Sequence, residues 1–331
     1  MRLVAAASAF VLFSSPVAFA QEKPSFDCSK ASTAVEKAVC KNAELAKADR
    51  EVAKGYADLI AKLAGPAKDH LASDQSRWIA NRNRGCGADI DEIEDCLKIR
   101  YGIRGAQLEF LAKDDYLFIS EQAIVKTGKV KRVDFRIDAA YPQFDGKSAD
   151  FANVNRSFAE AAQKAGNQAI PVASKIDDEL EQEWSYEQNF VLYRPARQAV
   201  AVAINYRSYT GGAHGYSATK CSLVDLRSGK LVGLDEVFAP GDEWLKRLIL
   251  LVRDDLKDQF VDRPGNDFAL EPDNLAKLLR QGQRYLFRDD NVLEVIFNPY
   301  EVGPYAAGPY SVEISFDDLR PVFRADGPLG N

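Results

Sequence analysis

The sequence is poor in the residues from which catalytic and metal sites are usually built. Its 331 residues include two histidines, His70 and His214, no Cys-x-x-Cys pair and no Gly-x-Ser-x-Gly motif. The lack of paired cysteines beside a histidine argues against a structural zinc site. The lack of a nucleophile elbow argues against a serine hydrolase of that type. After residue 20 no run of about 18 apolar residues occurs, so we predict no transmembrane helix.

The first twenty residues have the order of a secretory signal peptide. Arg2 precedes an apolar run over residues 3–13, and Ala18-Phe19-Ala20 forms a small-x-small cleavage site. The run is too short for a stable membrane anchor. We therefore expect a signal peptide over residues 1–20, cleaved near Ala20, and a periplasmic protein that does not insert into the membrane after cleavage. An uncleaved anchor is the alternative.

The charge of the chain is negative and unevenly spread. The sequence has 43 basic and 49 acidic residues, a net charge of −6. Basic and acidic residues nearly cancel between residues 22 and 113, so the remaining C-terminal part carries almost all of the negative charge. An acidic surface disfavours nucleic acid and favours a basic partner, although it can also serve solubility alone. We predict no nucleic-acid partner.

Four of the five cysteines lie within the first hundred residues and predict two disulfides. An even, clustered number in an exported chain is typical of a disulfide framework, for which three pairings are possible. Residues 31–63, 67–84 and 91–113 have helical patterns, with Gly65-Pro66 ending the first. Antiparallel arms would place inner positions opposite inner positions. We therefore expect an all-α helical hairpin over residues 21–113 with nested bridges, Cys40–Cys86 inside Cys28–Cys96.

The same segment resembles a known family. Its cysteine order, "DQSRWIANRNRGC" at residues 74–86 and "RYGIRGAQL" at 100–108 are similar to the N-terminal domain of the LprI family of lysozyme inhibitors. The resemblance covers about residues 25–113, although this chain lacks the lipidation cysteine of the family's namesake. It implies a lysozyme-type muramidase as a partner. We expect Trp78 in this segment to be a core aromatic rather than a binding residue.

From residue 114 to residue 331 the pattern changes to strands mixed with helices. "VKRVDFRIDAAYPQF" at 130–144 alternates as a strand does, whereas residues 149–165 and 241–260 have helical periodicity. The elements do not follow a steady βαβ rhythm. We therefore expect a second domain of the α+β class with a mixed or antiparallel sheet.

Three segments of this second domain resemble another family. "YRSYTGGAHGYS" (206–217), "LVDLRSGKLVGLDEVF" (223–238) and "NPYEVGPYAAGPYSVEISFDDL" (298–319) are similar to the C-terminal domain of the RsiV anti-sigma-factor family. The preceding segment 141–158 resembles the deacetylase-associated module that often accompanies it. Because RsiV binds lysozyme, the resemblance implies an extracytoplasmic ligand-binding domain.

His214 lies in the glycine-rich stretch "SYTGGAHGYS" and admits three interpretations. With Cys221 and Asp225, four residues apart on one strand face, it could form a hydrolase site. Alternatively, Gly211, Gly212 and Gly215 supply a hairpin turn that His214 stabilises. Contact with a ligand is the third interpretation. We favour the turn and expect Cys221 to be a buried thiol.

The stretch "NPYEVGPYAAGPY" at residues 298–310 is the better candidate for a binding surface. Its prolines and glycines disfavour a regular strand or helix, and tyrosine offers a large contact area at low entropic cost. Tyr300, Pro304, Tyr305 and His214 are the candidate ligand-binding residues, although the loop could simply cover a sheet edge.

Taken together, the patterns predict a periplasmic binding protein with no catalytic residues, metal or cofactor of its own. The expected partner is a lysozyme-type muramidase. A protein that binds peptidoglycan fragments is the first alternative, and a hydrolase that uses His214 is the second.

Overall fold

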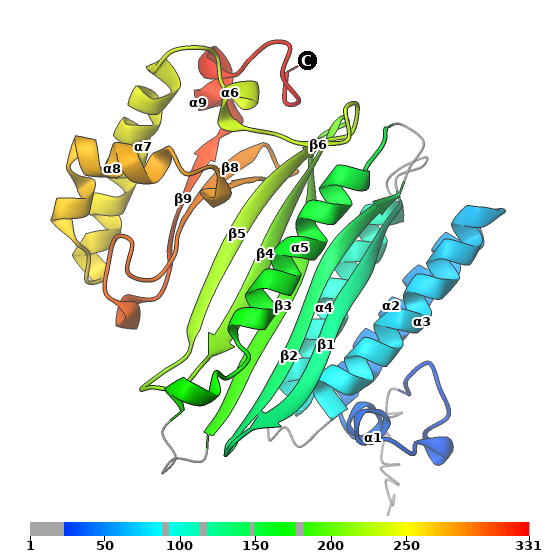
Figure 1. Cartoon of the computed structure of the whole chain (residues 1–331). Helices are drawn as coiled ribbons and strands as arrows, with labels where there is room; N and C mark the ends of the chain where they lie inside the picture. The colour runs from blue at the N-terminus through cyan, green and yellow to red at the C-terminus, as the bar shows by residue number, and fades with distance from the viewer. Residues whose placement is uncertain (1–22, 88–92, 113–117, 146–148, 177–181, 331) are drawn as a thin grey trace, which may run out of the picture.

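The computed structural model describes residues 23–87, 93–112, 118–145, 149–176 and 182–330. The expected signal peptide lies outside these residues, as does the expected domain boundary between residues 113 and 114. Both therefore stay predictions. A long twisted sheet occupies the centre of the molecule, with helices on both of its faces and a C-terminal lobe beside its last strands (Figure 1). Within the described ranges, no helix is both long and apolar enough to span a membrane.

The N-terminal part is helical, as expected, but its first helix is interrupted. The helices are α1 (Ala34–Lys41), α2 (Ala43–Ile60), α3 (Pro66–Gly87) and α4 (Ile93–Ala112). Asn42 separates α1 from α2, because its backbone is extended and its side chain accepts hydrogen bonds from the amides of Glu44 and Leu45. A side chain that satisfies these amides begins a new helix.

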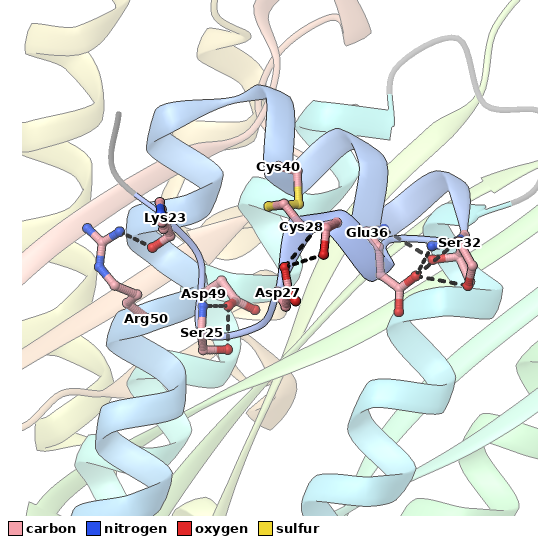
Figure 2. The surroundings of a disulfide bond; sticks show 11 residues. Lys23, Ser25, Asp27, Cys28, Ser32, Glu36, Cys40, Asp49 and Arg50 are labelled. Carbon is pink, nitrogen blue, oxygen red and sulfur yellow. Dashed lines mark hydrogen bonds between the residues drawn. A yellow bond between two sulfur atoms is a disulfide. The ribbon is translucent and has the colours of Figure 1, made fainter. Parts of the chain in front are cut away.

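This interruption explains why the nested disulfide pairing was wrong. All four cysteines are bonded, but as Cys28–Cys40 and Cys86–Cys96, with Cα atoms 5.8 and 5.7 Å apart. Because the chain turns at Asn42, Cys40 lies in the last turn of a short separate helix, where it is bonded to Cys28 of the 3-10 turn Cys28–Lys30 (Figure 2). Cys86 and Cys96 lie at the adjoining ends of α3 and α4. Each bridge therefore joins positions that are close in sequence.

The central sheet has six strands in sequence order. They are β1 (Phe118–Val130), β2 (Val133–Asp145), β3 (Gln182–Ala196), β4 (Ala199–Tyr209), β5 (Tyr216–Asp225) and β6 (Lys230–Leu231). Neighbours are antiparallel except β2 and β3, which are parallel because α5 (Ala152–Gln168) connects them. This mixed sheet confirms the expected α+β class.

A second, antiparallel sheet forms the C-terminal lobe. It comprises β7 (Tyr285–Phe287), β8 (Val292–Phe297) and β9 (Tyr310–Ser315), with α6 (Leu234–Val237), α7 (Glu243–Asp262), α8 (Pro272–Leu279) and α9 (Phe316–Leu319) around it. Ala201, Ala203, Cys221 and Leu223 on one face of β4 and β5 belong to the same core as this lobe. The lobe is therefore packed on the end of the long sheet.

The N-terminal helices are packed on the sheet as well. Arg100 of α4 donates to the buried Asp138 of β2 at 2.5 Å, and the amide of Glu121 in β1 donates to Asp74 of α3 at 2.9 Å. Apolar residues of the helices and of the sheet also share one buried cluster. Trp78 is 3% exposed and lies against Tyr101, as expected for a core aromatic.

Candidate ligand-binding site

The β4–β5 connection makes a tight turn in which glycine is needed. Gly211 and Gly212 have φ values of 87° and 100°, a conformation that costs glycine little. At Gly215 a Cβ atom would lie 3.0 Å from the carbonyl oxygen of Ser208. His214 lies in this connection, just before β5, and its side chain is exposed.

The loop after β8 is fixed to the neighbouring sheet. The side chain of Asn298 accepts a hydrogen bond from the amide of Thr219 at 2.8 Å and donates to the carbonyl of the same residue at 3.1 Å. Glu301 forms an ion pair with Arg284 at 3.1 Å, and the Arg284 side chain is 3% exposed. The loop is therefore held against β5 from its first residues.

The other side of the loop is fixed to the end of α7. The amide of Asn266 donates to the carbonyl of Val302 at 2.9 Å. Arg263 donates to the carbonyls of Ala307 and Pro309, and its guanidinium lies 4.0 Å from the centre of the Tyr310 ring. These contacts explain how a stretch rich in proline and glycine has one defined conformation.

Both connections meet in an aromatic cluster, defined here as His214, Tyr300 and Tyr305. The imidazole of His214 stacks on Tyr305 with ring centres 3.9 Å apart and planes at 18°. Nδ1 of His214 lies 2.8 Å from the carbonyl oxygen of Gly215, and Nε2 lies 3.3 Å from the hydroxyl of Tyr300. A carbonyl only accepts, so Nδ1 of His214 carries a proton and donates to Gly215.

The cluster is presented to solvent rather than buried. Tyr300 is 60% exposed and has a φ of 74°, which is strained for a residue with a bulky side chain. Tyr305 is half-buried and donates to the carbonyl of Gly215 at 2.5 Å, while Pro304 before it is exposed. The structure thus brings together the four residues singled out in the sequence.

The hydrolase interpretation of His214 gains no support from the geometry. Cys221 is 1% exposed, faces the core of the C-terminal lobe, and burial raises the pKa of its thiol to about 12. A buried, protonated thiol is a poor nucleophile. Asp225 accepts hydrogen bonds from Arg227 and Ser228 in the next turn. Among the described residues, no hydrogen bond links His214 to Cys221 or Asp225.

Sequence reasoning missed two features beside the cluster. Tyr206 and Tyr216 lie 6.2 Å apart on adjacent strands, and burial, then Glu301 and Tyr305, raises the pKa of Tyr216. Near the loop, Asp262 and Asp267 are exposed and make no ion pair with any described residue. The two tyrosines are diagonal neighbours, because Tyr206 is opposite Ala218 and Tyr216 is opposite Ser208, so their contact depends on the strand register. The exposure of Asp262 and Asp267 beside the loop depends on where α7 ends.

No group of three or more metal-ligating side chains is clustered within the described ranges. The aromatic cluster instead offers two ring faces, a phenol hydroxyl and neighbouring carboxylates. Such a surface can bind a partner through aromatic packing and charge.

Comparison with known families assigns three segments of the chain. Residues 28–114 match the family described as lysozyme inhibitor LprI, and residues 129–217 match the family described as deacetylase PdaC. Residues 235–317 match a family of unknown function, DUF3298, which is the domain of RsiV-like proteins. The two resemblances seen in the sequence are confirmed.

Individual relatives are distant. Over 190 residues the chain is 24% identical to the peptidoglycan-N-acetylmuramic acid deacetylase PdaC of Bacillus subtilis strain 168, a match that covers 54% of this chain and 40% of that protein. Solved DUF3298 family structures from Pseudomonas aeruginosa PAO1 and Bacteroides fragilis NCTC 9343 are 15% and 18% identical. The Pseudomonas structure covers 64% of this chain and 97% of its own chain. The Bacteroides structure covers 63% of this chain and 94% of its own chain. Each has a TM-score of 0.43. The chain thus combines, in order, an LprI-like, a PdaC-like and a DUF3298-like segment.

Proposed function

We propose that this protein is an exported, non-catalytic binding protein that captures a lysozyme-type muramidase, with Tyr300 as an anchor of the binding surface. The match of residues 28–114 to a lysozyme-inhibitor family supports the class of partner. The observation that carries the proposed site is the position of Tyr300, which is 60% exposed yet held by the contact of its hydroxyl with His214 and of its ring with Tyr305.

A fixed, exposed tyrosine suits protein recognition for a physical reason. Binding orders side chains, and that ordering costs free energy. Tyr300 is already ordered by His214 and Tyr305, and the loop beneath it is anchored by Asn298 and Glu301. Most of the ordering cost is therefore met in the free protein, as in other surfaces where a few aromatic residues dominate the binding energy.

The acidic residues beside the loop also support this surface as the binding site for a cationic partner. Asp262 and Asp267 are exposed beside the loop, and the part of the chain after residue 113 carries almost all of the negative charge. Animal-type lysozymes are strongly cationic, so an acidic surface would steer them toward the cluster and raise the association rate. Exposed ion pairs add only about 0–1 kcal/mol each, so the aromatic anchor must supply the specificity.

The residues that characterise the N-terminal helices as LprI-like are poorly placed to contact a muramidase. Asp74, Trp78, Arg82 and Arg104 are all buried, and they join the helices to one another and to the sheet. In this chain the family-like motif therefore stabilises the fold. This supports placing the muramidase contact in the C-terminal lobe.

Peptidoglycan-fragment binding is a second candidate. It is supported by the match to a relative whose name describes a peptidoglycan deacetylase, although the chain spans 40% of that protein's length. The two functions predict different ligands for the aromatic cluster, a cationic protein in one case and a neutral or anionic glycan in the other.

The test is to titrate the whole protein with an animal-type lysozyme and to follow binding by calorimetry and inhibition by a cell-lysis assay. The intact chain is needed, because helices and sheet share a core and separated halves would expose it. We expect Tyr300→Ala to weaken binding about 30-fold, since an anchor contributes about 2 kcal/mol or more. Leu250→Ala, at a side chain that is 63% exposed on α7, is the matched control and should have no effect.

Association should also slow between about 50 mM and about 500 mM salt, because screening shortens the range of the charges. Unchanged affinity in Tyr300→Ala, or no binding of lysozyme by the wild-type protein, would contradict the proposed function.

A further inference from the structure

A buried set of charged side chains joins the N-terminal helices to the central sheet, on the face opposite α5 (Figure 1). The set, called here the charged joint, consists of Asp74 of α3, Arg100 and Arg104 of α4, Glu121 of β1 and Asp138 of β2. The side chain of Arg100 is 13% exposed, and the other four residues are buried. None of the five belongs to the aromatic cluster, so the joint is separate from the proposed muramidase site.

The charges of the joint do not balance. Nη1 of Arg104 lies 2.7 Å from Oδ2 of Asp74, and Nη2 of Arg100 lies 2.5 Å from Oδ2 of Asp138. Each guanidinium therefore has a carboxylate of its own, and Glu121 is a further carboxyl for which the joint offers no third cation. Its Oε1 is buried and accepts no hydrogen bond from any described residue. A buried carboxylate without a partner is costly, because it loses its hydration and gains no counter-charge.

A proton on Glu121 removes this imbalance. Burial has the largest effect on this carboxyl and raises its pKa, while Arg100 and Arg104 of α4 lower the pKa and Asp74 of α3 raises it. Opposite Glu121 on β2 lies Pro142, which has no charge. With Glu121 protonated, the positive charges of the two arginines equal the negative charges of Asp74 and Asp138.

A second titratable contact lies one turn before Asp74 on α3. Nδ1 of His70 lies 3.0 Å from Oδ2 of Asp145 at the end of β2, and both side chains are about half exposed. The contact is an ion pair only while the imidazole is protonated, and histidine changes its charge between about pH 5 and pH 8. Protonation therefore strengthens the contact of the helices with the sheet at His70 as well as at Glu121.

We propose that the charged joint and the His70–Asp145 pair form a pH-sensitive latch, which holds α3 and α4 tightly on the sheet in acid and loosens as the pH rises. Protonated Glu121 favours the closed latch fully below the pKa of an ordinary glutamate, and this contribution is lost as the pH rises through the raised pKa of the closed state. The His70–Asp145 ion pair is lost in the same direction, when the imidazole gives up its proton. Opening of the latch would bring Asp74 and Arg104 into contact with solvent.

Hydrogen–deuterium exchange of the intact protein between about pH 5 and about pH 8 tests the latch. Protection factors, which correct for the intrinsic pH dependence of exchange, are compared between peptides from α3 and α4 and peptides from β8 and β9. We expect the protection of α3 and α4 to fall at least about tenfold over this range, since one unit of pKa difference between the closed and open states corresponds to a factor of about ten. The strands β8 and β9 lie in the C-terminal lobe and should show no comparable fall.

Two substitutions separate the contributions. Glu121→Gln has a neutral side chain at every pH, so it should retain at pH values of about 8 most of the protection that the wild-type protein has at about 5. Glu109→Gln, an exposed change on α4, is the matched control and should follow the wild-type protein. His70→Gln should remove a smaller part of the pH dependence, at most about fivefold, because the ion pair is half exposed.

Equal protection of α3 and α4 at both ends of the pH range in the wild-type protein would refute the latch, and so would an undiminished pH dependence in Glu121→Gln. The wild-type comparison needs no substitution, so it tests the latch even where the variant does not fold. The proposed muramidase function is measured separately, by binding at one pH to the C-terminal lobe, so failure of one proposal is distinguishable from failure of the other.

Discussion

The ring of His214 stacks on the ring of Tyr305, with ring centres 3.9 Å apart. His214 lies between β4 and β5 of the central sheet, whereas Tyr305 lies between β8 and β9 of the C-terminal sheet. The contact joins the β4–β5 turn to the loop after β8 and leaves Tyr300 on the outside. The candidate binding residues therefore form one physical unit, and a change in either connection should affect the other.

Replacing His214 by alanine should lower the free energy of unfolding by about 1 kcal/mol, because an aromatic pair of this kind contributes about 0.5–1.5 kcal/mol. Denaturant titration measures the change. His214→Phe retains the stacked ring and should recover most of the loss, although it lacks the hydrogen bonds to Gly215 and Tyr300. An alanine variant as stable as the wild-type protein would show that the stacking is incidental.

Replacing Tyr300 by glycine should leave the protein more stable than replacing it by alanine, and both variants should bind the muramidase weakly. The φ of 74° at this position strains a residue with a Cβ atom but not glycine, so Tyr300→Gly should be about 1 kcal/mol more stable than Tyr300→Ala. Both variants lose the contacts of the ring with His214 and Tyr305. Thermal melting and calorimetric binding, measured on the same sample, test both effects. Asn291→Gly, at a φ of 62° in the β7–β8 turn, is the control and should leave binding unchanged. Equal stability of the glycine and alanine variants would contradict the strain argument, and an unchanged affinity in Tyr300→Gly would contradict the role of the ring as an anchor.

Mapping of the unreduced protein should yield two peptide pairs, Cys28–Cys40 and Cys86–Cys96, with Cys221 as a free thiol. Removing the second bridge by a double Cys86→Ala, Cys96→Ala change should cost about 3 kcal/mol in the chain-entropy model for a loop of this length. Cys221 should react with a thiol reagent only after unfolding, because its side chain is buried. Recovery of a Cys40–Cys86 peptide would overturn the pairing.

Replacing Glu121 by glutamine should stabilise the protein at neutral pH. Burial raises the pKa of this carboxyl, against the opposing effects of Arg100 and Arg104. A carboxyl whose pKa is raised in the folded state contributes to the stability of the protein at low pH. This contribution is fully present below the pKa of a glutamate in the unfolded chain, and it is lost as the pH rises through the folded-state pKa.

The stability difference between Glu121→Gln and the wild-type protein should therefore grow from acid to neutral pH, which urea titrations at several pH values would measure. Glu109→Gln, an exposed change on α4, is the control and should show no such trend. A difference that is constant with pH would mean that Glu121 does not change its protonation on folding.

The sequence alone determined the local features. Helical periodicity identified the N-terminal helices and α7, alternation identified β2, and the clustered cysteines predicted disulfides. These features depend on neighbours within a few residues, so a linear pattern contains them. Gly211 and Gly212 of the β4–β5 turn were recognised for the same reason, since positive φ is a local requirement. Gly215 does not have a positive φ; a side chain is disfavoured there because the carbonyl of Ser208 lies close.

Only the tertiary structure decided which distant groups meet. The extended backbone at Asn42 turned Cys40 away from Cys86, and no periodicity indicates such a break when the flanking residues all favour helix. The stacking of His214 on Tyr305 and the pairing of Lys126 with Asn167 depend on strand register and on the packing of α5. Those are set by the burial of whole faces, a property of the assembled fold rather than of any one segment.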